Sequence, residues 1–176
     1  MITNTVVFPR SIPGGGKSSL SNLLKKLAEA NGLTCSIHST DSKFYNEKGE
    51  YVFDANKINY FHKLNFIDFA ESTAKGTNLV ILDNTNLVLS YFKHYVNNAI
   101  AEQYNMVEVV FYPDSLENHF KRNLHNVPLV NIERMAKKLD LGLQFGQSMR
   151  YEVAPHTWKM DVEYVAQKIV SGVLGN

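Results

Sequence analysis

A glycine-rich segment near the start of the sequence has the residue types that bind phosphate. Positions 14–16 are glycines followed by Lys17, Ser18 and Ser19, with the apolar residues 6–8 before them and a helical pattern after them. In such a strand–loop–helix, backbone N–H groups and the helix start point at phosphates, lysine adds positive charge, and the serine hydroxyl binds Mg²⁺. We therefore predict a nucleoside triphosphate site formed by Gly14, Gly15, Gly16, Lys17, Ser18 and Ser19, with Ser18 as a Mg²⁺ ligand.

Ser11 stands where loops of this type usually begin with glycine. If the backbone there had positive φ, serine would cost about 1 kcal/mol, which a folded protein tolerates. A Gly-Lys-Ser string also occurs in unrelated surface loops. The strand pattern before this string and the helix pattern after it favour the phosphate site.

Two aspartates each follow an apolar run. Asp83 comes directly after residues 79–82, which suit a buried parallel strand, and Asp41 follows residues 33–38. Phosphoryl transfer needs a group that holds the water shell of the metal and a group that orients or deprotonates the acceptor. We assign the first role to Asp83 and the second to Asp41. The alternative is a carboxylate that only satisfies a turn or caps a helix, and the residues alone leave both interpretations of Asp41 open.

Basic residues further along the chain could supply positive charge to the transferred phosphoryl group. They are Lys121, Arg122, Arg134, Lys137 and Lys138. A charge run on a short helix is, however, more often a solvated face. His125 has no second histidine at metal-ligand spacing, which favours a hydrogen-bonding or surface role.

Strand and helix patterns alternate along the whole sequence. Apolar runs predict strands at residues 5–8, 33–38, 79–83, 107–112 and 151–153. Helical spacing of apolar residues predicts helices around residues 20–27, 54–75, 92–100, 115–123, 128–139 and 162–173. One of these helices should bury Phe92, Val96, Ala99 and Ile100 together on one face.

This alternation predicts an α/β fold with a parallel sheet of about five strands flanked by helices. Ligands of such sheets bind at the carboxyl ends of the strands. The phosphate loop, Asp41 and Asp83 all follow expected strands, so we expect them to converge on one edge of the sheet.

Composition limits the remaining possibilities. A length of 176 residues suits one domain, residues 1–176, and the net charge of +1 argues against a surface that coats a nucleic-acid duplex. No stretch approaches the roughly 20 apolar residues of a membrane helix, and the N-terminus lacks a secretion signal. The single cysteine, Cys35, is expected to be a small core residue. These features suggest a cytoplasmic protein without a membrane partner; they leave the oligomeric state open.

Taken together, four segments resemble the polynucleotide 5′-hydroxyl kinase family, the P-loop kinases of phage RNA repair and related eukaryotic domains. The segments are residues 12–18, residues 39–41, residues 80–87, and Arg122-Asn123 with Val127-Pro128, Ile132 and Met135. The last is the most specific, because it looks like the helical lid of this family, here about residues 115–139. The resemblance implies a P-loop kinase fold, ATP and Mg²⁺ as ligands, an RNA or DNA 5′ end as acceptor, Asp41 as general base and Arg122 as a lid arginine on the ATP phosphates.

The sequence departs from that family at two substrate contacts. Phe44 stands where phage members have an arginine that grips a nucleic-acid phosphate, and the lid loop has His125 and Asn126 in place of a further arginine. Phe44 or Tyr45 could instead stack a base, although loop aromatics are more often packing anchors. Two alternatives therefore stand beside a polynucleotide kinase: a P-loop kinase of a small hydroxyl acceptor such as a nucleoside, sugar or other metabolite, and a nucleotide-binding module that transfers no phosphate.

Overall fold

The computed structural model describes residues 1–175 and contains one five-stranded parallel sheet. Its strands are β1 (Thr5–Arg10), β2 (Cys35–His38), β3 (Leu79–Leu82), β4 (Asn105–Phe111) and β5 (Met149–Val153). The spatial order is β2-β3-β1-β4-β5, with every neighbouring pair parallel. The predicted α/β fold with five strands is confirmed.

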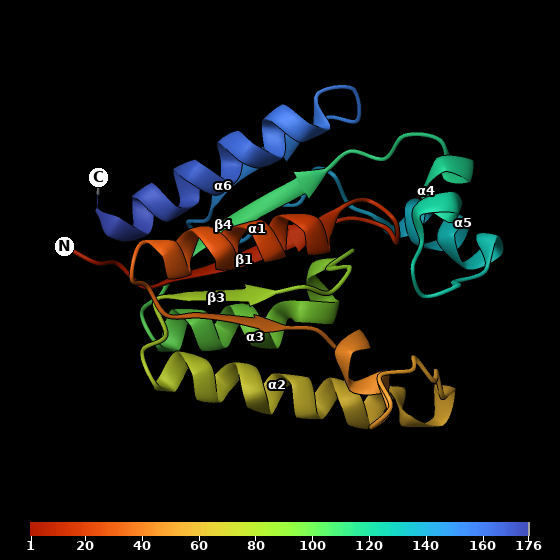
Figure 1. Ribbon diagram of the computed structural model, residues 1–176, viewed down its shortest axis with the longest axis horizontal. Coiled ribbons are helices and arrows are strands. Elements are labelled where there is room, and N and C mark those ends of the chain that lie inside the picture. The colour runs from red at the N-terminus through yellow and green to blue at the C-terminus, as the bar shows by residue number, and fades with distance from the viewer. Residues whose placement is uncertain (176) are drawn as a thin grey trace.

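Helices cover both faces of the sheet and one of its ends (Figure 1). They are α1 (Lys17–Ala30), α2 (Ile58–Ala74), α3 (Leu89–Ala101), α4 (Leu116–Arg122), α5 (Leu129–Lys138) and α6 (Trp158–Leu174), with short 3₁₀ helices η1 (Asp41–Phe44) and η2 (Ala55–Lys57). Helices α1 and α6 lie on one face and α2 and α3 on the other, while α4 and α5 stand beyond the carboxyl ends of the strands. Within the described residues, no helix is long and apolar enough to cross a membrane.

Each face of the sheet has its own apolar core. Leu24 of α1 and Ile169 of α6 pack on one face with Ile81, and Phe69 of α2 and Phe92 of α3 pack on the other. This two-sided burial explains why β3 reads as an unbroken apolar run.

Three details differ from the sequence prediction. Strand β1 continues past residue 8 through Pro9 to Arg10, and all six of its residues are buried. On α3, Ile100 is 55% exposed and Tyr95 is buried in its place. Cys35 is only partly buried, at the start of β2.

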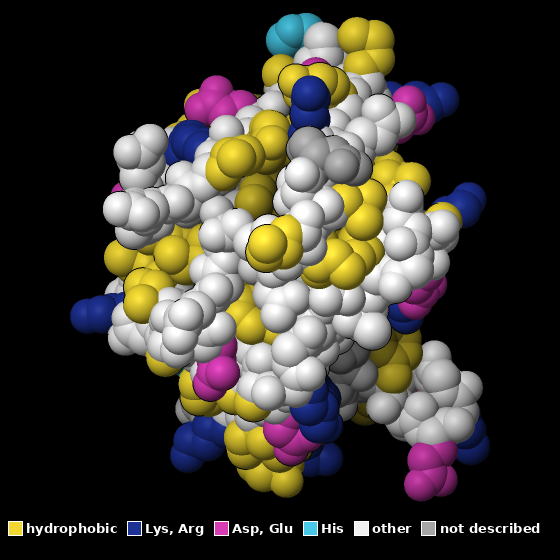
Figure 2. Space-filling model, turned by 90° about the vertical axis from the view of Figure 1, so that its left-hand side faces the viewer, with side chains coloured by type: hydrophobic (Ala, Val, Ile, Leu, Met, Phe, Trp, Pro, Cys, Tyr) yellow, Lys and Arg dark blue, Asp and Glu magenta, His cyan; other side chains and the backbone are white. Residues whose placement is uncertain are grey.

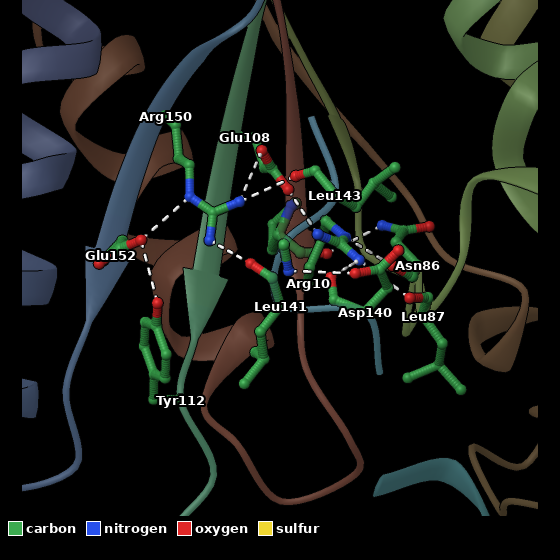
Figure 3. A network of polar contacts seen from close by, with 12 residues as sticks. Arg10, Asn86, Leu87, Glu108, Tyr112, Asp140, Leu141, Leu143, Arg150 and Glu152 are labelled. Atoms are coloured by element: carbon green, nitrogen blue, oxygen red, sulfur yellow. Dashed lines mark hydrogen bonds and ion pairs between the residues drawn. The ribbon is translucent and has the colours of Figure 1, made fainter. Parts of the chain in front are cut away.

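A buried ion pair explains why β1 extends to Arg10. Arg10 and Glu108 of β4 are both fully buried and lie 2.5 Å apart. The Arg10 guanidinium also donates to the carbonyl oxygens of Asn86, Leu87 and Asp140 at 2.8, 2.9 and 2.6 Å (Figure 3). Because these bonds satisfy the buried charge, an arginine can end a central strand directly before the phosphate loop.

Arg150 of β5 extends this network on the other side of Glu108. Its Nη1 lies 3.5 Å from Glu108 and 2.9 Å from the Leu143 carbonyl, and its Nη2 donates to the Leu141 carbonyl at 2.5 Å. The two arginines together hold the segment that leaves α5, which fixes the base of the helical end relative to the sheet.

The end of the molecule away from α4 and α5, where both ends of the described chain lie (Figure 1), has few charged side chains at its centre. Figure 2 shows that end with Lys, Arg, Asp and Glu side chains mainly around the rim, and hydrophobic and uncharged atoms in the middle. A concentrated basic surface is not visible on this face.

Candidate active site

The phosphate loop joins β1 to α1, and its glycines are required for space as well as conformation. Gly14 and Gly16 have φ values of +73° and +94°, which side-chain-bearing residues avoid. A Cβ would lie 2.2 Å from the His119 carbonyl oxygen at Gly14, and 2.5 Å from Trp158 Nε1 at Gly16. The loop is thus closely packed between α4 and the start of α6.

Ser11 does not adopt the left-handed backbone that would have made it costly, since it is absent from the positive-φ residues of the described chain. It is fully buried, and its N–H donates to the Thr85 carbonyl at 3.1 Å. A Cβ on Gly15 would lie 1.8 Å from its hydroxyl oxygen. Ser11 therefore fills space beneath the loop without backbone strain.

Lys17 is buried at the start of α1, and its Nζ donates to the Ile12 carbonyl at 3.1 Å. Burial lowers its pKa, while the negative charges of Asp83 and Asp41 oppose that shift. The ammonium group thus lies between the loop and two carboxylates, where an incoming phosphate could replace the Ile12 carbonyl as its partner.

Asp83 follows β3, and its carboxylate is buried near Lys17 and the Ser18 hydroxyl. Its Oδ1 is buried and has no hydrogen-bond partner among residues 1–175. Burial raises the pKa of Asp83, and Lys17 and the Ser18 hydroxyl oppose the shift. An unpartnered carboxylate oxygen beside a hydroxyl fits Mg²⁺, which prefers oxygen ligands.

The protein alone supplies few ligands for such an ion. Among residues 1–175, no group of three or more His, Cys, Asp or Glu side chains is placed to hold a metal. Mg²⁺ in protein sites commonly takes most of its ligands from water and substrate phosphates. The residues present therefore fit an ion that arrives with a nucleotide.

Asp41 begins η1, beyond the end of β2, and its side chain is 51% exposed. Its Oδ1 accepts a 3.4 Å hydrogen bond from the Tyr51 hydroxyl, and its Oδ2 lies 3.9 Å from Nε2 of His125. The N-cap of η1 is Thr40, without a side-chain cap bond. Asp41 is therefore not the N-cap of η1.

In α4 and α5, the segment expected to form the lid, the apolar residues of one helix face pack inward and the Lys and Arg residues are exposed. Ile132 of α5 is buried against Ile12 and Leu87, with Met135 beside them, so the Ile/Met spacing anchors the lid below the phosphate loop. Arg122 at the end of α4 donates through Nη2 to Asp114 Oδ1 at 2.7 Å and is 52% exposed.

The other basic residues of the lid lie away from the site. Arg134, Lys137 and Lys138 are exposed and do not line the cavity described below, and Lys138 donates to the Tyr91 hydroxyl at 3.0 Å. For these three residues the structure agrees with the alternative interpretation of the charge run, a basic helix face in contact with solvent.

One cavity of about 400 Å³ brings the predicted residues together. Its walls include Gly14, Gly15, Gly16, Lys17, Ser18, Ser19, Asp41, Asp83 and Arg122. The convergence expected from the carboxyl ends of β1, β2 and β3 is therefore present in the structure.

The same cavity contains residues that the sequence analysis missed. Tyr112, Asp114, His119, Pro155 and Trp158 also line it. Tyr112 and Asp114 follow β4, at the same sheet edge, and that position was the available signal for them. Trp158 gave no local signal, since only folding brings it to Gly16.

The aromatic residues near Asp41 divide into two kinds. Phe44 is 3% exposed and packs against the rings of Phe53 and Phe61 at 5.0 and 4.8 Å, so it is a packing anchor. Tyr45, in contrast, is 49% exposed. The ring of a further residue, Tyr51, contacts the His125 ring, with the two ring centres 4.5 Å apart. Base stacking by Phe44 is thus excluded, whereas Tyr45 stays accessible.

Comparison with known proteins places the fold. No protein-family model matches the chain. Kti12 from Chaetomium thermophilum bound to ADP-AlF3 aligns with a TM-score of 0.70 at 14% identity, covering 96% of this chain and 98% of that one. APS kinase CysC from Mycobacterium tuberculosis, bound to AMPPNP and APS, aligns with a TM-score of 0.60 at 14% identity over 99% of both chains. The chain therefore has the fold of P-loop kinases, and both of these proteins bind nucleotides in their structures.

A sequence relative is also detectable. Human NEDD4-binding protein 2 is 32% identical over 135 residues, which is 74% of this chain but 7% of that protein. The similarity therefore concerns one segment of a much longer protein.

Proposed function

We propose that this protein is an ATP-dependent kinase of the polynucleotide 5′-hydroxyl kinase type, which transfers the γ-phosphoryl group to the 5′-hydroxyl of RNA or DNA. The observation that carries the proposal is the shared cavity, in which Asp41 faces the phosphate loop together with Lys17, Asp83 and Arg122. We extend the proposal to residues 1–176 as one cytoplasmic kinase domain with a lid at about residues 115–139.

Each residue has a defined task in this proposal. Asp41 accepts the hydroxyl proton as the acceptor oxygen bonds to the γ-phosphorus and the bond to the leaving ADP oxygen breaks. Lys17 and Arg122 stabilise negative charge on the transferred group, and the loop N–H groups hold the phosphates. Ser18 and Asp83 would hold Mg²⁺, which neutralises phosphate charge when bound.

Two features favour the polynucleotide as acceptor. The resemblance in residues 122–135 includes the anchoring of Ile132 and Met135, which fixes the lid next to the phosphate loop. The exposed ring of Tyr45 lies in the segment that begins with Asp41 and is available for base stacking.

One observation favours the alternative, a small hydroxyl acceptor. Lys43, the cation nearest to the position of the missing arginine, is paired with Asp68. A phosphodiester would have to displace that carboxylate, whereas an uncharged nucleoside or sugar would not.

The deciding experiment follows γ-labelled phosphate from ATP with Mg²⁺ into 5′-hydroxyl single-stranded RNA and the matching DNA. We expect labelling that disappears in Lys17→Ala and Asp41→Ala, with ATP binding preserved in Asp41→Ala. Glu47→Ala is the matched control, because this exposed carboxylate is near Asp41 in sequence but does not line the cavity.

Near-normal labelling by Asp41→Ala would refute the assignment of the base. ATP binding without transfer to either nucleic acid would exclude the polynucleotide and lead to a screen of metabolite acceptors. If no metabolite accepted phosphate either, the protein would be a nucleotide-binding module.

A further inference from the structure

Asp114, between β4 and α4, is a carboxylate inside a cavity that should attract phosphate. A negative charge there repels a triphosphate, so its presence needs a compensating role. Its Oδ1 accepts from Arg122 Nη2 at 2.7 Å and lies 3.1 Å from His119 Nε2, and its Oδ2 accepts from Asn118 Nδ2 at 3.2 Å. The carboxylate thus accepts hydrogen bonds from two side chains of α4, those of Arg122 and Asn118, and the His119 ring lies beside it.

His119 connects α4 to the phosphate loop. Its side chain is buried, and Nδ1 lies 2.9 Å from the Pro13 carbonyl oxygen. Burial lowers the pKa of His119, which favours the neutral ring. With Nδ1–H donating to Pro13, Nε2 can accept the Asp114 backbone N–H at 3.3 Å, which assigns the tautomer.

The backbone of α4 also lies directly on the loop. The His119 carbonyl oxygen approaches Gly14 so closely that a Cβ there would be 2.2 Å away. Phosphate loop, His119, Asp114 and Arg122 therefore form one continuous set of contacts.

We propose that Asp114 is a positioning residue that holds Arg122 toward the phosphate site, and that His119 fixes this pair to the phosphate loop. The inference rests on the proposed function, in which Arg122 contacts the ATP phosphates. A free arginine side chain would lose rotamer entropy when it is ordered at the phosphates, and a side chain that is already held loses less. Asp114 engages only Nη2, and in the part of the chain that the structure describes the other donors of the guanidinium fork have no partner, which leaves them for phosphate oxygens.

A double-mutant cycle tests this coupling through transfer kinetics. Arg122→Ala should lower kcat by about 10³-fold, and Asp114→Asn by about tenfold or more with a smaller change in KM. In the Arg122→Ala background, Asp114→Asn should change kcat by less than about twofold, because the residue through which it acts is gone.

Two further variants separate positioning from a structural role. Asp114→Glu, which keeps the charge, should recover part of the lost kcat. Glu117→Gln is the matched control, since Glu117 pairs with Lys121 at 2.7 Å on the exposed side of the same helix, and it should leave kcat unchanged. Equal losses for Asp114→Asn in both backgrounds would overturn the proposal.

The same cycle can be measured without any acceptor, which separates this inference from the proposed function. If the wild type labels no polynucleotide, the readout is the ratio of ATP to ADP affinity. Asp114→Asn should then lower that ratio several-fold when Arg122 is present and leave it unchanged in Arg122→Ala. An unchanged ratio in both backgrounds would overturn the positioning role.

Discussion

Replacing Arg10 tests whether the buried ion pair holds the sheet to the helical end. Arg10→Met keeps an apolar stem of similar length but removes the charge and four hydrogen bonds, to Glu108, Asn86, Leu87 and Asp140. Breaking a buried pair costs about 3–5 kcal/mol, because one charge is left uncompensated. Arg150 still reaches Glu108 at 3.5 Å, but three carbonyl oxygens lose a donor. We therefore expect a loss of about 4–5 kcal/mol.

Such a loss is a large part of the about 5–15 kcal/mol that stabilises a typical domain. Urea unfolding followed by circular dichroism and by the fluorescence of Trp158, the single tryptophan, measures it. The matched variant is Arg10→Met with Glu108→Leu, which removes both charges.

The double variant should recover at least about 2 kcal/mol relative to Arg10→Met, because an apolar pair can replace a buried ion pair at little cost. The reasoning would be refuted by a loss below about 1 kcal/mol in Arg10→Met. It would also be refuted by a double variant less stable than the single one.

Two further predictions concern pH and the phosphate loop. Burial lowers the pKa of His38 to about 4 from its ordinary 6.5, so the unfolded chain binds more protons between these values and stability falls as the pH drops through this window. Between about pH 8 and about pH 5 this single group should lower the free energy of unfolding by about 2 kcal/mol. Urea unfolding at both pH values should show that His38→Gln lacks this decrease. An equal decrease in the wild type and in His38→Gln would contradict the assignment. Gly14→Ala should weaken the binding of a fluorescent ATP analogue by about tenfold or more, because it displaces α4 as well as straining the backbone. Gly32→Ala is its control, with nearly the same φ of +72° and no atom within 4 Å, and should affect stability alone; equal ATP affinity in the two variants would show that α4 does not depend on Gly14.

The sheet could be predicted from the sequence because its strands are apolar and locally bounded. Leu79–Leu82 is a short, unbroken apolar run of β-branched and leucine residues that ends in a carboxylate, as expected of a buried parallel strand, and parallel connection then places Asp83 beside the phosphate loop. Local patterns could not reveal that Arg10 belongs to β1, since its partner Glu108 is 98 residues away. The exposure of Ile100 was missed because spacing shows an apolar stripe but not which edge of it is buried: the buried stripe of α3 includes Tyr95, and Ile100 lies outside it.

The candidate site was predictable to the extent that its residues follow strands. Lys17, Asp41 and Asp83 do so and line one cavity. Asp114 and His119 act through contacts across α4 and the phosphate loop, which no short motif encodes. Phe44 was ambiguous because burial of an aromatic residue depends on Phe53 and Phe61, two residues that fold back over it.

The central place of β1 has a consequence for how the chain acquires its structure. Thr5 pairs with Leu79 on one side and with Asn105 on the other, so β1 pairs only with strands that lie at least about 70 residues further along the sequence. Long-range pairing of this kind carries a loop-closure cost and slows folding. The Thr3 N–H donates to the Val173 carbonyl at 2.8 Å, so the residues before β1 are held by α6, which lies about 170 residues further along the sequence. The apolar residues of β1 therefore stay unprotected until β3 and β4 pair with them, and we expect the sheet to form late in folding, when these distant segments have met.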